Sequence, residues 1–509
     1  MSADYLLGVD IGTYSSKGVL VSAAGEVVAL ESAAHALDLP RPGWAEHDPE
    51  GVWWRDFVAI CRGLLARSGI APGQIAAVGI STISPAVVAV DRQGQALRPA
   101  ILYGIDTRAT REIEELSALT GASLSAQSGA PKVMWLRRAE PQVWARTHLV
   151  LNGPGYLVLR LTGAATIDIY DATVFAPFFD PQRLAWDEGL GEVVAPPEMM
   201  PRPTWSCEVA GRVTPEAARE TGLAAGTPVI TGTADAAAEA VSAGLAQVGD
   251  MMVMYGSSTF FILKTPHLLE SRVFWGSRFL EPDTYVVAGG TATAGSLTQW
   301  FRDQFAQAEL AAEQGGGESA YAALARLGER SPLGARGLLV LPYFAGERTP
   351  LHDPQARGVV FGLTLAHSRA DLYRAVLESV GYAIRHNLDA MREEGIAAQR
   401  ILAVGGGTRN RLWMQIVSDI AGIEQHIPAQ QIGASLGDAF LAGVGVGLFA
   451  TSAEAARWVQ IAQVIRPDPD AHAAYGEYYR LYRALYTRTA PLMGALGALA
   501  HGPSGQAAG

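Results

Sequence analysis

The chain has 509 residues, of which 49% are hydrophobic and 17% are charged, and its formal net charge at pH 7 is −11. This length exceeds what one hydrophobic core can serve and predicts two large domains, while the acidic balance without a basic block argues against nucleic acid or an anionic membrane surface as a partner. Two cysteines, Cys61 and Cys207, are too few for a disulfide framework or a zinc cluster.

The start of the chain, MSADYLLGVD, lacks the charged region of a signal peptide and leads directly into an apolar run. The sequence also contains no apolar run long enough to cross a bilayer. We therefore expect a cytoplasmic protein that binds a small molecule, with no membrane and no nucleic acid as a partner. Whether it forms a homodimer is left open.

The stretch from residue 6 to residue 21, LLGVDIGTYSSKGVLV, predicts a β-hairpin with a tip of small and hydroxyl-bearing residues. Gly12 has no Cβ, so backbone N–H groups at the tip can approach an anionic oxygen. Beyond it, Thr13 and Ser15 add hydroxyl donors on either side of Tyr14. Such a tip suits a phosphate group, although an ordinary hairpin turn would show the same local pattern.

Asp10 ends the first strand of this hairpin. A carboxylate beside a triphosphate repels it unless a cation lies between them, so Asp10 predicts a Mg²⁺ ion bound directly or through water. The alternative is an exposed aspartate without a ligand. The hairpin is not a P-loop, because its turn joins two strands and no G-x-x-x-x-G-K-[ST] motif occurs.

A third strand, VVALESAAHAL, completes a meander, and a helix is predicted to begin near Asp48. The next apolar run, residues 75–81, predicts a central strand that ends at Thr82, Ser84 and Pro85. Open α/β sheets bind their ligands at such strand ends.

Two acidic residues further along are harder to interpret from their local pattern. Asp106 lies two residues before Arg108 in a loop, where the two can simply form a surface ion pair. Asp235 falls in the first turn of a helix predicted within residues 227–244, where its local role is to stabilise the helix dipole.

The run DMMVMYGSSTFFILK, residues 250–264, repeats the pattern of the opening hairpin, with Gly256, Ser257, Ser258 and Thr259 at its tip. Two such hairpins indicate duplicated halves that face each other across a cleft. We place the boundary after residue 245. The predicted division is 1–245, 246–490 and a partly disordered tail, 491–509.

The segment ILAVGGGTRNRLWMQIVSDIAG predicts a strand, three glycines and a helix. Gly405, Gly406 and Gly407 allow the backbone to lie flat against a planar or anionic ligand at the helix N-terminus. A dinucleotide-binding motif is excluded, because the spacing is not G-x-G-x-x-G.

The two hairpins, the strand-end aspartate and the strand–GGG–helix segment together resemble the FGGY family of carbohydrate kinases, in the superfamily of actin and hexokinase. The resemblance runs from about Tyr5 to Tyr486, and residues 358–378 match the family's C-terminal signature throughout. The other signature is matched only around Lys132 and Trp135. The stretches GWAEHDPEGVWW and GERTPLHDPQARG are most similar to the xylulokinase branch.

This resemblance implies an α/β protein with two ribonuclease-H-like domains and an interdomain cleft that binds ATP and Mg²⁺. It also implies transfer of the γ-phosphoryl group of ATP to a sugar hydroxyl, with a ketopentose, first of all D-xylulose, as the expected acceptor. Other pentuloses (ribulose, L-xylulose), hexuloses and short polyols such as erythritol or glycerol remain open as alternatives.

Carried over residue by residue, the resemblance makes Asp235 the catalytic base and places Asp106 and Arg108 in the sugar-contacting loop. The nucleotide-binding motifs match Asp10 with Gly12-Thr13, then Gly256 to Thr259, then Gly405, Gly406 and Gly407 with Asn410. Tyr14 and Ser15, beside the first motif, are also counted among the cofactor-binding candidates.

The chain departs from xylulokinases at two places beside the expected sugar. Ser84-Pro85 stands where Met-His is typical, and Asp235-Ala236 stands where Asp-Asn is typical. We count Ser84, Pro85 and Asp235 among the substrate-binding candidates, and these departures leave the identity of the sugar open.

Two other classes of protein compete with a kinase. A superfamily ATPase without sugar transfer is disfavoured by Asp106, Arg108 and Asp235 at matching positions. A sugar-sensing regulator is disfavoured because no helix-turn-helix or basic segment precedes Tyr5.

Overall fold

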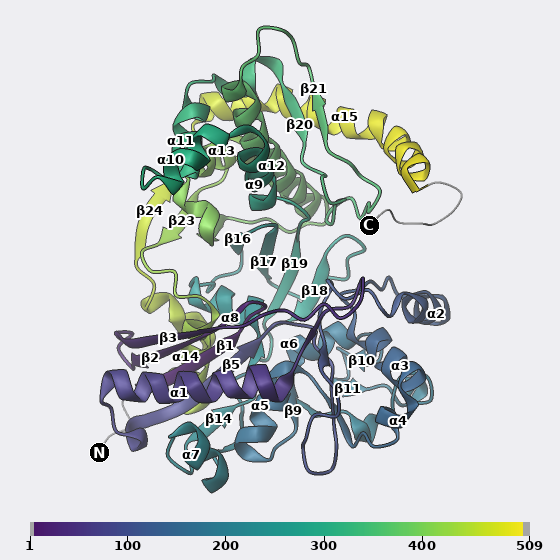
Figure 1. Cartoon of the computed structure of the whole chain (residues 1–509), viewed down its shortest axis with the longest axis vertical. Helices are drawn as coiled ribbons and strands as arrows, with labels where there is room; N and C mark the ends of the chain where they lie inside the picture. The colour runs from purple at the N-terminus through teal and green to yellow at the C-terminus, as the bar shows by residue number, and fades with distance from the viewer. Residues whose placement is uncertain (1–4, 502–509) are drawn as a thin grey trace.

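The computed structural model describes residues 5–501 and contains two α/β halves, each built on a seven-stranded sheet (Figure 1). The first sheet has the order β13-β14-β5-β1-β2-β3, and β15 pairs with β5. Its strands are β1 (Tyr5–Ile11), β2 (Ser15–Ser22), β3 (Val27–Ala34), β5 (Ile75–Thr82), β13 (Val209–Arg212), β14 (Pro228–Ile230) and β15 (Thr233–Ala234).

The second sheet has the order β18-β19-β17-β16-β22-β23-β24. Its strands are β16 (Asp250–Tyr255), β17 (Thr259–Thr265), β18 (Trp275–Arg278), β19 (Tyr285–Thr291), β22 (Arg400–Val404), β23 (Gln425–Pro428) and β24 (Ile461–Ile465). In both sheets an antiparallel hairpin leads into a third antiparallel strand, and the first hairpin strand has a parallel neighbour on its other side. The predicted α/β fold with two similar halves is confirmed.

Helices α1 (Arg55–Ser68), α5 (Gly153–Thr162) and α7 (Pro215–Thr221) pack on the first half. The predicted helix start near Asp48 is confirmed, because the Asp48 side chain accepts a hydrogen bond from the backbone of Glu50 at the beginning of a π-helical turn that leads into α1. Four further helices lie in an insertion between β7 (Ala100–Ile101) and β12 (Arg202–Thr204): α2 (Thr110–Thr120), α3 (Gly129–Ala139), α4 (Pro141–Trp144) and α6 (Ile169–Ala172).

The second half has its own helices, drawn in green to yellow in Figure 1. They are α9 (Gly295–Phe305), α10 (Gln307–Gln314), α11 (Ala320–Glu329), α12 (Arg369–Glu393), α13 (Arg411–Ala421) and α15 (Pro469–His501). A hydrophobic core joins α12, α13 and α15 to the second sheet, and a separate core fills the first half.

A third core lies between the two sheets and contains residues from both of them. Its helices are α8 (Asp235–Ser242) and α14 (Ala434–Gly445), which pack on each other between the sheets (Figure 1). Although α14 belongs by sequence to the predicted segment 246–490, it lies on β1 and β5 of the first sheet. Glycines allow this close approach, since a Cβ on Gly8 or Gly79 would stand within 2.0 Å of a carbonyl oxygen of α14.

The C-terminal helix α15 continues to His501, so residues 491–501 are helical where a partly disordered tail was predicted. The segment GPSGQAAG, the rest of that predicted tail, lies outside the described residues. None of the helices within residues 5–501 is long and apolar enough to span a membrane.

Candidate active site

The first predicted phosphate turn lies between β1 and β2 and is closed by a hydrogen bond from Gly12 N to Ser15 O of 3.0 Å. Two histidines hold the carbonyl groups of this turn. His35 Nε2 lies 3.0 Å from Gly12 O, and His47 Nε2 lies 3.1 Å from Thr13 O. Because both carbonyl oxygens are engaged within the protein, they do not oppose an anion at the tip.

The protonation of His47 follows from its partners. Trp53 Nε1 donates to His47 Nδ1 at 3.0 Å, so the proton of the neutral ring is on Nε2, which donates to Thr13 O. Burial and then the charge of the neighbouring His35 lower the pKa of His47, the Thr13 carbonyl and Asp56 act in the opposite direction, and the resulting pKa is about 4.

This buried neutral histidine predicts acid sensitivity. Its pKa is about 4 in the folded chain and ordinarily 6.5, so the folded state binds fewer protons and stability is lost as the pH falls from 6.5 towards 4. The loss for this group is up to about 3 kcal/mol. Thermal unfolding measured between pH 7 and pH 4.5 should therefore show a smaller decline for His47→Gln than for the wild type; equal declines would contradict this account.

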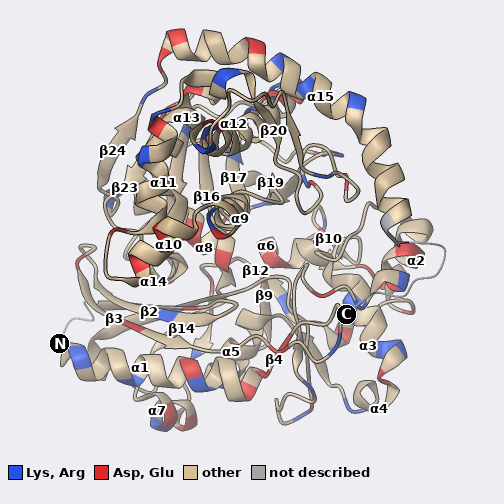
Figure 2. Ribbon diagram, turned by 45° about the horizontal axis from the view of Figure 1, so that its top comes forward, with Lys and Arg blue, Asp and Glu red and all other residues tan. Residues whose placement is uncertain are grey.

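Four carboxyl groups gather beside this turn, from both halves of the sequence. Asp10 is the next-to-last residue of β1, Asp235 and Glu239 lie one turn apart on α8, and Asp438 lies on α14. Ser81 Oγ lies 3.1 Å from Asp10 and 2.7 Å from Asp438, so it links β1 to α14. Figure 2 shows acidic ribbon segments beside α8 and α6, where the two halves meet.

These carboxyl groups destabilise one another's charges. Burial raises the pKa of Asp10 to about 6, with Ser81 and Lys17 partly offsetting it. Burial and then the charge of Asp10 raise the pKa of Asp235 and Asp438 well above the ordinary value, and raise the pKa of Glu239 to about 7. A group of acids in this state is a favourable place for a cation.

The donor set fits a hydrated Mg²⁺. Asp438 Oδ1 is buried and has no hydrogen-bond partner. Among residues 5–501, however, no three His, Cys, Asp or Glu side chains converge closely enough to hold one ion directly. Mg²⁺ commonly keeps several waters and touches one or two carboxylates, so binding through water suits this arrangement.

Sequence reasoning missed two members of this group, Glu239 and Asp438, and the positive charge of Lys17 beside them. Asp438 left a signal, because it is the only charged residue in the run ASLGDAFLAGVGVGLF. A lone acid in an apolar helix needs a buried partner or a function.

The loop at residues 101–108 reaches the first phosphate turn through Tyr103, whose hydroxyl lies 3.0 Å from Thr13 Oγ1. Burial raises the pKa of Tyr103, and its hydrogen bond to Thr13 lowers it. The charge of Asp235 also raises this pKa, whereas the charge of Arg348 lowers it.

Asp106 and Arg108 form a buried ion pair rather than the surface pair considered as an alternative. Both side chains are 0% exposed, with Arg108 Nη2 2.6 Å from Asp106 Oδ2. Asp106 also accepts from Ala45 N at 2.7 Å, and the Arg108 guanidinium stacks on Trp44. These partners indicate a role in holding the loop, and the predicted contact of this pair with a sugar stays a prediction.

Ser84 and Pro85 follow β5 after one intervening residue, Ile83, at the strand end predicted to face a ligand. Ser84 is partly exposed and its hydroxyl donates to Asp171, whereas Pro85 is buried.

The second predicted phosphate turn joins β16 to β17 and is closed by a hydrogen bond from Gly256 N to Ser258 O of 3.0 Å, which spans one residue fewer than the bond that closes the first turn. Thr259 is buried and its hydroxyl lies 2.8 Å from that of Thr291 on β19. The start of α9 packs on this turn, since Gly295 N donates to Gly256 O at 2.9 Å. Ser257 at the tip is exposed.

The three glycines follow β22 and lead into α13 through a short 3₁₀ turn. Gly405 has a φ of +91°, which favours glycine, and a Cβ there would stand 2.8 Å from Tyr255 O. A Cβ on Gly406 would meet no atom within 4 Å, so this residue faces open space. Asn410 caps α13 by accepting from Trp413 N at 3.1 Å, a structural role that its match to the adenosine motif did not predict.

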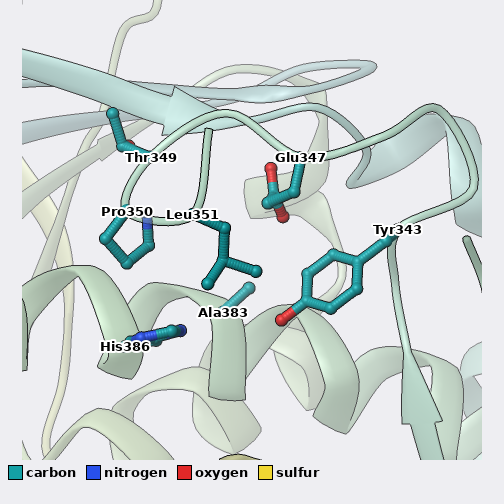
Figure 3. A pocket seen from close by; sticks show the side chains of 7 residues that line it. All are labelled: Tyr343, Glu347, Thr349, Pro350, Leu351, Ala383 and His386. Carbon is teal, nitrogen blue, oxygen red and sulfur yellow. The ribbon is translucent and has the colours of Figure 1, made fainter. Parts of the chain in front are cut away.

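The second half also contains a small hollow under the loop at residues 347–351, seen in Figure 3. The Glu347 side chain points from the loop towards Tyr343, and Ala383 and His386 of α12 line the opposite side of the hollow. Glu347 Oε1 accepts from the backbone N of Ala292 and of Arg348, both at 2.7 Å. The hydrogen bond from Ala292 to Glu347 holds this loop against the end of β19. None of the residues that line the hollow belongs to the predicted site.

Comparison with known proteins gives the family. The N-terminal domain of the FGGY family of carbohydrate kinases matches residues 5–242, and the C-terminal domain of that family matches residues 251–446. The xylulose kinase of Escherichia coli (strain K12) is 31% identical, over 96% of this chain and 99% of that protein. A glycerol kinase of Symbiobacterium thermophilum is 30% identical, over 90% of this chain and 93% of that protein.

Among solved structures, the xylulose kinase from Rhodospirillum rubrum has a TM-score of 0.88 to this fold at 32% identity, covering 96% of this chain and 99% of that one. Matches to both domains, together with relatives aligned over nearly the whole chain, show that this chain belongs to the FGGY family of carbohydrate kinases.

Proposed function

We propose that this carbohydrate kinase transfers the γ-phosphoryl group of ATP to a hydroxyl of a ketopentose, with D-xylulose giving D-xylulose 5-phosphate as the first choice. The observation that carries the proposal is the position of Asp235. It lies at the start of α8, directly after β15, which pairs with β5 at Ser81, and the Ser81 hydroxyl contacts Asp10 beside the first phosphate turn. The xylulose kinases named above support the choice of sugar.

In this proposal Asp235 orients the attacking hydroxyl and accepts its proton as the phosphoryl group transfers. The turns at Gly12 and Gly256 bind the phosphates through backbone N–H groups, and Gly406 lines the nucleotide side. Asp10, with Asp438 beside it, would hold Mg²⁺ through water. The ion would supply positive charge against the phosphate oxygens and would favour the ionised form of the surrounding carboxyl groups.

A screen of ADP release tests the acceptor. We expect D-xylulose to give the highest kcat/KM in a panel of pentuloses, hexuloses, tetritols and glycerol. If a polyol or hexulose gave a clearly higher kcat/KM than D-xylulose, the protein would still be a kinase but its acceptor would differ from the one proposed. Glycerol is the most informative comparison, because one relative is a glycerol kinase. ATP turnover that no member of the panel stimulates would favour an ATPase without sugar transfer.

The nucleotide side has its own prediction. Gly406→Val should weaken ATP binding far more than sugar binding, because the new side chain enters space that no protein atom occupies. Calorimetric titrations of the variant with ATP and with sugar measure the two affinities, and wild-type thermal stability is the control for folding. Equal losses of both affinities would point to a general disturbance of the fold.

A cytoplasmic location also belongs to this proposal. So does a homodimer, which sedimentation of the purified protein would test.

A further inference from the structure

Two buried carboxyl groups, those of Asp168 and Asp171, lie behind Ser84. Asp171 belongs to the short helix α6, and Asp168 directly precedes that helix. Asp171 is 1% exposed, and each of its oxygens accepts one hydrogen bond, Oδ1 from the Ser84 hydroxyl and Oδ2 from the side-chain amide of Asn152. The Asn152 amide nitrogen can only donate, so Asp171 Oδ2 is an acceptor. Burial raises the pKa of Asp171, while the hydrogen bonds from Ser84 and Asn152 lower it because they favour the ionised carboxylate.

Asp168 ties the same helix to the strand that leads into Asp235. Its Oδ2 accepts from Thr233 Oγ1 at 2.8 Å and from Ser206 Oγ at 2.9 Å. Thr233 lies on β15, two residues before Asp235, and β15 pairs with β5 by placing Thr233 opposite Ser81. The two carboxyl groups therefore hold both strand ends of the proposed acceptor site: Asp171 accepts from Ser84 after β5, and Asp168 accepts from Thr233 on β15, just before Asp235.

The direction of the Ser84 hydrogen bond has a chemical consequence. A serine hydroxyl has one proton to donate and lone pairs to accept with. Since Asp171 takes that proton, only the lone pairs of Ser84 Oγ are left for a ligand. A group that binds Ser84 must then be a donor, such as a sugar hydroxyl, and an analogue that lacks this hydroxyl leaves a polar atom of the site unpaired.

We propose that Asp171 is a positioning residue that sets acceptor specificity, by keeping Ser84 as a hydrogen-bond acceptor for one hydroxyl of the sugar. The proposal rests on the proposed kinase function and deepens it. Asp171 does not touch the sugar and acts through Ser84.

The test compares Asp171→Asn, Ser84→Ala and the double variant. The amide of the asparagine can donate to Ser84, which turns the serine proton towards the ligand. We expect the KM for the sugar to rise about tenfold or more in each single variant, with the KM for ATP unchanged within about twofold. Because Asp171 acts through Ser84, the double variant should be no worse than the singles.

A series of monodeoxy sugars gives a readout that a merely structural role would not move. The wild type should discriminate by about tenfold or more against the analogue that lacks the hydroxyl facing Ser84, and both single variants should lose most of that discrimination. Dissociation constants from calorimetry without ATP provide the same comparison independently of turnover. Asp180→Asn, in the same insertion at β10 (Phe179–Asp180), is the matched control and should keep both KM values.

Parallel changes in the sugar and ATP constants, or additive effects of the two substitutions, would overturn the proposal. If Asp171→Asn does not fold, Ser84→Ala decides alone, because retained discrimination against every deoxy sugar would show that Ser84 receives no hydroxyl. A wild type that binds and phosphorylates none of the sugars would instead refute the proposed function.

Discussion

Replacing Asp235 by asparagine is expected to lower the kcat of sugar phosphorylation by about 10²–10⁴-fold while ATP binding and the fold are kept. Asparagine has nearly the same shape as aspartate but cannot accept the proton of the attacking hydroxyl. Removing this carboxylate also relieves repulsion in the acidic group around Asp10, so we expect no loss of thermal stability.

Steady-state kinetics with the best sugar, nucleotide titration and thermal unfolding together check this prediction. Asp470→Asn, an exposed aspartate in the first turn of α15, is a control that should change none of the three. A folded Asp235→Asn variant with nearly wild-type kcat would remove Asp235 from the role of base. Loss of ATP binding in that variant would instead place Asp235 on the nucleotide side.

Local patterns in the sequence were sufficient for the parts of the site that are contiguous in the chain. The hairpins at Gly12 and Gly256 are built as predicted, and their repetition indicated two similar halves. A hairpin tip depends on a few neighbouring residues, because its strands pair with each other directly. The strand–GGG–helix segment was predictable for the same reason.

The acidic group was not predictable in this way, because it depends on α14 crossing to the first sheet. Asp438 contacts the Ser81 hydroxyl, which also contacts Asp10. This contact exists only because α14 packs there, although α14 lies more than 350 residues after Ser81 in the sequence. The burial of Asp106 and Arg108 was missed for a related reason. Trp44 and Ala45, from a distant loop, cover that pair and supply its partners, and no local pattern reports such a contact.

The packing of α14 on α8 predicts the second large effect. Gly437→Ala should destabilise the protein strongly, because a Cβ at residue 437 would stand 1.9 Å from the carbonyl oxygen of Ala238. The obstacle is backbone rather than a flexible side chain, so one of the two helices must move. Overpacking of this kind costs typically about 1–3 kcal/mol and occasionally more.

We expect Gly437→Ala to unfold several degrees below the wild type or to be recovered largely as aggregate. Asp438 is the next residue, so a displaced α14 should also lower turnover even in the folded fraction. Gly476→Ala is the matched control, because a Cβ there meets no atom within 4 Å and alanine is the better helix former by about 1 kcal/mol. If both variants unfolded at the wild-type temperature, α8 and α14 would have to be further apart than this packing allows, and the acidic group that depends on their contact would lose its structural basis.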